Sequence, residues 1–157
     1  HNGSVFTDAR LKPGLIELRS TDGVVPGGDL ALALAEVPAF WVGLSYDPKA
    51  RAKALERLCA LPHEEFRAAQ AAVPRLGLAA PWGSETVADV ARDLIEMAQA
   101  GVARLREAGR EGELASRALD QVMERVTFGE SPSDTLRRLE AAGGRSALLD
   151  ALRIPSA

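Results

Sequence analysis

The chain has 157 residues, enough for one domain with its own hydrophobic core, and a net charge of −3. Acidic and basic residues are interspersed rather than gathered into a basic face, so we expect no nucleic-acid partner. We find neither the ~18 to 20 consecutive apolar residues that cross a bilayer nor a secretory signal pattern, so we expect no membrane partner and a cytoplasmic location. Cys59 is the only cysteine, which excludes an internal disulfide and a cysteine-built zinc site.

The first segment, residues 5 to 21, has the pattern of extended structure. The pair Pro13-Gly14 punctuates it, and the run LIELRST that follows is short, partly β-branched and closed by an Asp-Gly turn pair. A lone hairpin is only marginally stable in water. We therefore expect region 1–28 to belong to a larger antiparallel sheet whose other strands this chain does not supply.

From Asp29 onward the apolar residues recur with the period of a helix, so we expect region 29–157 to be helical. The run DLALALAEVPAFWVGLSY is apolar nearly all round, which predicts a helix buried on most sides. The fold class is therefore α+β, with a minor β element and a dominant helical part. We expect helices over about 29–46, 49–61, 62–73, 85–108, 113–127, 131–144 and 145–154.

Several residues predict where these helices begin and end. Asp47 precedes a proline and should cap the second helix, while Ser84 should cap the longest one after a loop at 73–84. Ser131 is followed by Asp134 three positions later, a variant of the capping box. Gly143 should stop that helix.

The strand segment holds the side chains best suited to chemistry. Side chains alternate along a strand, so Glu17 and Arg19 should share one face about 7 Å apart, with Ile16 and Leu18 on the other face. Glutamate is a hard oxygen donor for Mg²⁺, and arginine is a planar fork that matches a phosphate. The pair could hold a metal-nucleotide, or it could equally decorate a solvated strand face. Spacing alone leaves both interpretations open.

Three motifs point to a known family. The chain contains VFTDARLKPGLIELRSTDG, then LALAEVPAFWVGLSYD and then VPRLGLAAP, in the order and with the spacing that this family shows. Together they resemble the C-terminal part of glutamate–cysteine ligase, most closely its plant and proteobacterial branch. The segments TVADVARDLIEMAQAGVARL and SPSDTLRRLEAAG extend the resemblance, less specifically, over most of the chain.

The resemblance implies roles for individual residues. By position, Glu17 corresponds to a Mg²⁺ ligand of the family, and Arg19 to the arginine that contacts the phosphate transferred from ATP. Arg10 corresponds to an arginine that we expect to contact the nucleotide or a substrate carboxylate. Asp22 matches an aspartate for which a turn role and a ligand role both stay open. The implied substrates are glutamate, cysteine and ATP, with Mg²⁺.

Other features of the chain limit what the resemblance implies. The family's enzymes are well over twice as long, so we expect this chain, which begins at His1, to need the N-terminal remainder of the enzyme or a partner chain. The family's tryptophan and arginines after the Asp-Gly turn are replaced by VVPGGDLALAL, so the amine substrate could differ from cysteine. A non-catalytic helical module that keeps the fold is a further alternative.

Other residues that carry chemistry have simpler interpretations. Cys59 lies among leucines and should be a small buried hydrophobe, and Phe40 and Trp41 should belong to the core. Arg75 and Trp82 lie in the predicted loop, where each could instead wall a cleft. Arg104 and Arg106 of the long helix alternate with acidic residues and should be solvated. His63 has no second histidine near it in the sequence, so it is a poor candidate for a metal ligand.

Overall fold

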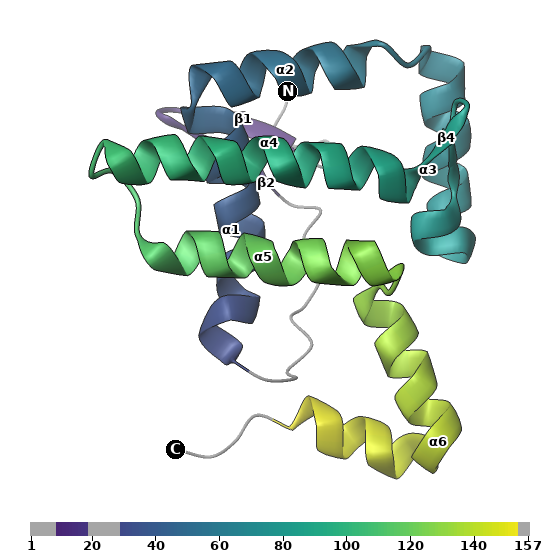
Figure 1. Ribbon diagram of the computed structural model, residues 1–157. Helices are drawn as coiled ribbons and strands as arrows, with labels where there is room; N and C mark the ends of the chain where they lie inside the picture. Colours follow the sequence, from purple (N-terminus) through teal and green to yellow (C-terminus); the bar gives the residue numbers. More distant parts are fainter. Residues whose placement is uncertain (1–8, 19–28, 154–157) are drawn as a thin grey trace.

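The fold is described from a computed structural model, which describes residues 9–18 and 29–153 (Figure 1). These residues form two short hairpins and a set of helices, so the α+β class with a dominant helical part is confirmed. In chain order the elements are β1 (Ala9–Lys12), β2 (Leu15–Leu18), α1 (Leu30–Tyr46), α2 (Pro48–Cys59), α3 (His63–Leu76), the 3-10 turn η1 (Gly77–Ala79), β3 (Pro81–Trp82), β4 (Glu85–Thr86), α4 (Val87–Glu107), α5 (Glu113–Phe128) and α6 (Pro132–Leu152).

Strands β1 and β2 form an antiparallel hairpin that closes on a two-residue loop. Lys12 pairs with Leu15, and Gly14 between them has φ 79°. A proline followed by a glycine with positive φ is typical of a type II turn, where the glycine avoids a steric penalty. The strand prediction is confirmed in the described residues; membership in a larger sheet stays a prediction.

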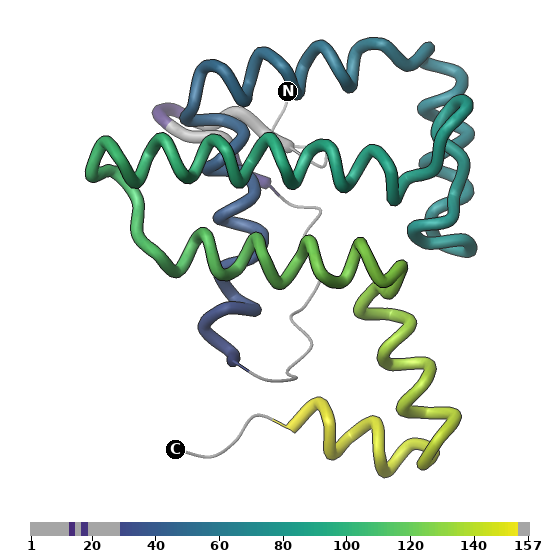
Figure 2. Tube along the Cα trace, viewed as in Figure 1, coloured from purple at the N-terminus to yellow at the C-terminus, as the bar shows by residue number. Residues whose placement is uncertain are grey.

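Helices α1, α4 and α5 enclose the hydrophobic core. Helices α4 and α5 lie side by side, and α1 crosses both, as the chain trace shows (Figures 1 and 2). Burying one apolar face of each helix is the main stabilising term for such an arrangement. The buried residues of the core cluster are Leu32, Ala39, Leu44, Ala54, Ala98, Val102, Ala115, Ala118 and Leu119.

Small residues let α1 and α4 approach until their backbones touch. A Cβ atom added at Gly43 would lie 2.9 Å from the Cα of Ala98, and one added at Gly101 would lie 2.9 Å from the carbonyl carbon of Gly43. Side-chain carbons essentially never approach backbone this closely, so only glycine fits at these two positions. This crossing fixes the position of α1 against the rest of the bundle.

The helix starts agree with the predicted caps except at α4. Asp47 accepts a hydrogen bond from the backbone N–H of Ala50 at 2.7 Å, and Ser131 caps α6, as predicted. The prediction of Ser84 as the cap of α4 is wrong, because Glu85 and Thr86 pair with Pro81–Trp82 in the β3–β4 hairpin. The cap is Thr86, which forms a capping box with Asp89. The predicted loop also begins later, since α3 continues to Leu76.

Helix α6 is bent and is loosely attached to the bundle. It runs from Pro132 to Leu152 with a non-helical residue at Gly144, one residue beyond the predicted stop at Gly143. None of its residues is buried, whereas α4 and α5 each bury several. In Figure 1 it extends from the end of α5, away from the crossing of α1 and α4.

Helix α1 is less enclosed than its composition predicts. It was expected to be buried on most sides, but Leu34 is 56% exposed and Trp41 is 39% exposed. Along the part of the chain described here, no single helix is long and apolar enough to cross a membrane. Helices α1 and α2 together meet that test of length and composition, although they meet at 97°.

Candidate functional site

The β1–β2 hairpin brings two of the three predicted site residues together. Its register pairs Arg10 with Glu17, in the middle of the four-residue strands. Glu17 is half-buried there, and the residue has an interaction partner. Arg10 and Glu17 are thus partners in the register of the hairpin.

The pairing of Arg10 with Glu17 is one that the sequence analysis missed. A two-residue loop at Pro13-Gly14 determines the register of a hairpin. Counting outward from Lys12 and Leu15 then places Arg10 opposite Glu17. The signal was therefore present in the sequence, in the length of the loop.

The remaining predicted residues of this segment lie outside the described residues. Arg19 is the first residue after the end of β2 at Leu18, and Asp22 lies three further on. The expectation that Glu17 and Arg19 share a strand face therefore stays a prediction, as does the choice between a turn role and a ligand role for Asp22.

The donor set on the hairpin is compatible with Mg²⁺ held jointly with a phosphate. Within residues 9–18 and 29–153 no group of three or more His, Cys, Asp or Glu side chains could enclose a metal ion. Mg²⁺, however, is usually held by one or two carboxylates together with substrate phosphates and water. The single carboxylate of Glu17 fits that mode, and further ligands would have to come from outside these residues.

The carboxylate of Asp47 is the one buried charged group among the described residues, and its role is structural. Arg104 donates to both of its oxygens, from Nε at 2.9 Å and from Nη2 at 2.6 Å. The hydrogen bond from Arg104 holds the pKa of Asp47 well below its usual range. Arg104 is partly exposed, but the interpretation of it as simple solvated surface is incomplete, because this side chain joins α4 to the start of α2.

Other carboxylates on the helices are also engaged by arginines. Arg57 donates to Asp93 at 2.8 Å and to Glu85 at 2.7 Å, which links α2 to α4 and β4. These contacts raise the pKa of Arg57, the hydrogen bond to Asp93 contributing most. Arg125 makes a two-pronged contact with Glu36, at 2.7 and 2.5 Å, which links α5 to α1. We interpret these pairs as the polar connections of the bundle rather than as ligand sites.

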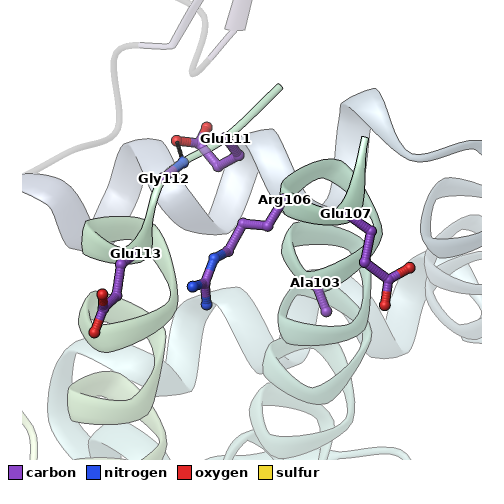
Figure 3. A pocket seen from close by; sticks show the side chains of 6 residues that line it. All are labelled: Ala103, Arg106, Glu107, Glu111, Gly112 and Glu113. Carbon is purple, nitrogen blue, oxygen red and sulfur yellow. Dashed lines mark hydrogen bonds between the residues drawn. The ribbon is translucent and has the colours of Figure 1, made fainter. Parts of the chain in front are cut away.

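Two hollows on the described surface lie among the helices, and neither is lined by hairpin residues. The larger, of about 550 Å³, lies between the end of α4 and the start of α5, where Arg106 reaches toward α5 and bonds Ser116 at 2.9 Å (Figure 3). The smaller, of about 370 Å³, lies between α2 and α4 and carries lysines and acids in similar number. Residues lining the larger one are Ala103, Arg106, Glu107, Glu111, Gly112 and Glu113.

The aromatic and cysteine predictions have mixed outcomes. Phe40 packs against the core, as predicted, but Trp41 beside it is exposed. Cys59 is also exposed, because it lies at the last position of α2, so its assignment to the interior is wrong. Trp82 packs edge-on against Phe66, with ring centroids 5.7 Å apart. That contact explains Trp82 without a ligand.

Comparison with known proteins shows the family: residues 1–150 match the family model described as glutamate-cysteine ligase family 2 (GCS2). The chain belongs to this ligase family. Among its relatives is the chloroplastic glutamate–cysteine ligase of Solanum lycopersicum, 31% identical over 141 residues, or 88% of this chain and 24% of that enzyme. The chloroplastic glutamate–cysteine ligase of Arabidopsis thaliana is 32% identical over 138 residues, or 87% of this chain and 24% of that enzyme. The chain therefore spans about a quarter of the length of these curated relatives.

Proposed function

We propose that this chain is the C-terminal part of a ligase that joins the side-chain carboxylate of glutamate to the amine of cysteine at the expense of ATP. Membership in the glutamate-cysteine ligase family is the observation that carries the proposal. The pairing of Glu17 with Arg10 in the register of the hairpin supports it, because a carboxylate is a suitable ligand for Mg²⁺ and an arginine suits a phosphate.

The proposed reaction solves a problem of charge. A carboxylate is a poor acyl donor because its negative charge repels an attacking amine. Transfer of the γ-phosphoryl group of ATP to a carboxylate oxygen forms an acyl phosphate and releases ADP. The cysteine nitrogen then attacks the acyl carbon, the C–N bond forms, and inorganic phosphate leaves with the bonding electrons while the amine gives up a proton.

The residues of the hairpin segment would act by position and charge. Phosphoryl transfer depends mainly on alignment and on neutralising the charge of the phosphate oxygens. Mg²⁺, when bound, would neutralise part of that charge, and Glu17 is the carboxylate that we assign to hold it. Arg19 is the catalytic residue that we assign to the transferring phosphoryl group, and Arg10 is assigned to the nucleotide. The remaining ligands of the site would come from the rest of the enzyme.

The proposal is tested by Glu17→Ala and Arg19→Ala in the intact enzyme. Each variant should lose about 10²- to 10³-fold in kcat/KM, because each removes a charge that the transferring phosphate needs. The measurement is ADP release that depends on both glutamate and cysteine, with circular dichroism to confirm that each variant is folded. Glu56→Ala and Arg67→Ala, at exposed helical positions, are matched controls that should turn over normally. Near-normal activity of the two hairpin variants would refute these assignments.

A second candidate function differs only in the amine substrate. The run VVPGGDLALAL at 24–34 replaces the tryptophan and arginines that the resemblance leads one to expect, so the contacts to the second substrate are altered. A panel of amino acids and amines, each tested for glutamate-dependent ADP release, separates the two functions. A non-catalytic role would instead be indicated if the intact protein failed to bind Mg²⁺-ATP in isothermal titration calorimetry.

A further inference from the structure

One face of α1 carries a continuous row of exposed apolar side chains, which we call the α1 stripe. It consists of Leu30, Leu34, Val37 and Trp41, at spacing i, i+4, i+7 and i+11. Their exposed fractions are 38%, 56%, 37% and 39%. This spacing places all four on one side of the helix, over about 16 Å of its length.

The α1 stripe lies opposite the face that packs on the bundle. Three of the four buried residues of α1, Leu32, Ala39 and Gly43, lie about half a turn away from the stripe. The fourth, Leu44, lies on the side of the stripe and marks its end, one turn beyond Trp41. Exposed positions that flank the stripe are also uncharged, namely Ala31, Pro38 and Ser45. A helix with two apolar faces is characteristic of an element covered on both sides.

The chemistry of the stripe selects an apolar protein surface as its partner. It has no charged group with which to hold a phosphate, a nucleic acid or a charged peptide, and its tryptophan is typical of the anchors found at the centre of protein interfaces. Helix α6 also exposes leucines, but charged residues alternate with them, including the exposed Arg137 and Arg138. Of these two exposed apolar faces, α1 presents the uncharged one.

We propose that the α1 stripe is covered by the part of the ligase that lies outside this chain. This inference rests on the proposed function, in that it assumes an intact ligase. The matched relatives are about four times as long as the region that aligns with this chain, so most of such an enzyme lies outside it. Helix α1 follows the segment that carries Glu17, so a contact along the stripe would also hold that segment against the remainder of the site.

Hydroxyl-radical footprinting of the intact enzyme, without substrates, tests the proposal. Leu34 and Leu149 offer a matched comparison, because they are the same residue type and are 56% and 54% exposed in this chain. We expect Leu34 to be oxidised several-fold more slowly than Leu149 in the intact enzyme, and Trp41 to be protected as well. Equal oxidation of the two leucines would overturn the proposal.

Two further measurements distinguish the remaining outcomes. Protection that disappears on dilution, in step with a change in sedimentation coefficient, would identify a second copy as the partner and would also overturn the proposal. Leu34→Glu should lower the thermal midpoint of the intact enzyme, whereas Leu149→Glu should leave it unchanged. Ligase activity is assayed separately: a protected stripe in an inactive protein contradicts only the proposed function, and an exposed stripe in an active ligase contradicts only this inference.

Discussion

Asp47 combines two structural tasks in one carboxylate. It accepts the backbone N–H of Ala50 at the start of α2, and it pairs with Arg104 of α4. The residue is only 6% exposed, yet each of its oxygens has a hydrogen-bond donor. A buried charge is tolerated only with this kind of compensation. Asp47 therefore holds the bend between α1 and α2 against the long helix.

We predict that Asp47→Asn lowers the free energy of unfolding at neutral pH by about 1 to 3 kcal/mol. The expected loss is smaller than for a fully buried ion pair, because Arg104 is partly exposed and solvent screens its charge. Because the pKa of Asp47 is lowered by folding, its stabilisation is complete above the unfolded pKa of about 3.9 and is lost as the pH falls toward the folded value. Urea midpoints of wild type and variant should therefore converge as the pH is lowered from 7 to 2.

The exposed Asp150 provides the control for this pH experiment. Asp150→Asn removes a carboxylate that approaches Arg153 only at 3.6 Å, on the last turn of α6. Its urea midpoint should match that of wild type at neutral pH. A constant difference between wild type and Asp47→Asn across the whole pH range would show that the pair contributes nothing through its charge.

At the residue scale, the sequence predicted local roles better than tertiary ones. The capping role of Asp47 follows from Asp-Pro before a helical run, and the structure confirms it. Its partner Arg104 lies 57 positions away, and no local pattern marks that pairing. The same reason explains Cys59: its neighbours predicted an apolar face, but which face of α2 meets the bundle depends on residues far along the chain.

At the scale of elements, the crossing of α1 and α4 sets the geometry of the bundle. The two helices meet through Gly43, Ala98 and Gly101, where backbone touches backbone. Larger residues would separate the axes, since ordinary helix pairs pack at about 8 to 10 Å according to the side chains between them. The apolar faces of both helices then reach the same core.

We predict that Gly43→Ala or Gly101→Ala destabilises the chain by about 2 kcal/mol or more, because the new methyl group meets backbone atoms that cannot rotate away. Chemical denaturation monitored by circular dichroism measures the loss. Gly112→Ala is the comparison variant: it has φ −106° and no atom within 4 Å of an added Cβ, so it should lose only the smaller preference for glycine over alanine at an N-cap. Equal denaturation midpoints for all three variants would mean that moving α1 and α4 apart does not lower the stability of the chain.

Element boundaries were predictable where the capping chemistry is local. Ser131 and Asp134 bond each other's side chain and backbone, and the Ser131 hydroxyl lowers the pKa of Asp134. Ser84 failed as a cap because the short pairing of β3 with β4 uses the following residues, and a two-residue strand leaves no periodic signal. Gly143 predicted the break in α6 to within one residue.

At the scale of the whole molecule, stability is distributed unevenly. Helices α4 and α5 bury residues along their length, including Val102 and Leu119, whereas no residue of α6 is buried. Segments with few buried contacts open locally at a lower free-energy cost than core helices. The bend at Gly144 further shortens each helical stretch of α6.

We therefore predict that backbone amides of α6 exchange hydrogen faster than those of α4 under native conditions. Exchange followed by mass spectrometry at the peptide level measures the difference, and the segments of α4 around Ile95 and Val102 should be the most protected. Uniform protection of both helices would indicate that α6 unfolds only together with the bundle, contrary to its exposure.

The overall class was predictable from the sequence, and the arrangement in space was not. Apolar periodicity predicted a helical region after a strand segment, which the structure confirms. Apolar periodicity did not predict which faces of the helices stay exposed. Helix α1 is apolar nearly all round, so its sequence pattern does not mark the side that packs on the bundle. The loop of the hairpin determines the pairing of Arg10 with Glu17, whereas membership of the hairpin in a larger sheet stays a prediction.

The exposed position of Cys59 at the end of α2 has a practical consequence. Since no other thiol occurs in these 157 residues, a maleimide dye would attach to this chain at one defined point without any substitution. A fluorophore there would report on the surroundings of the C-terminal end of α2 without an engineered cysteine.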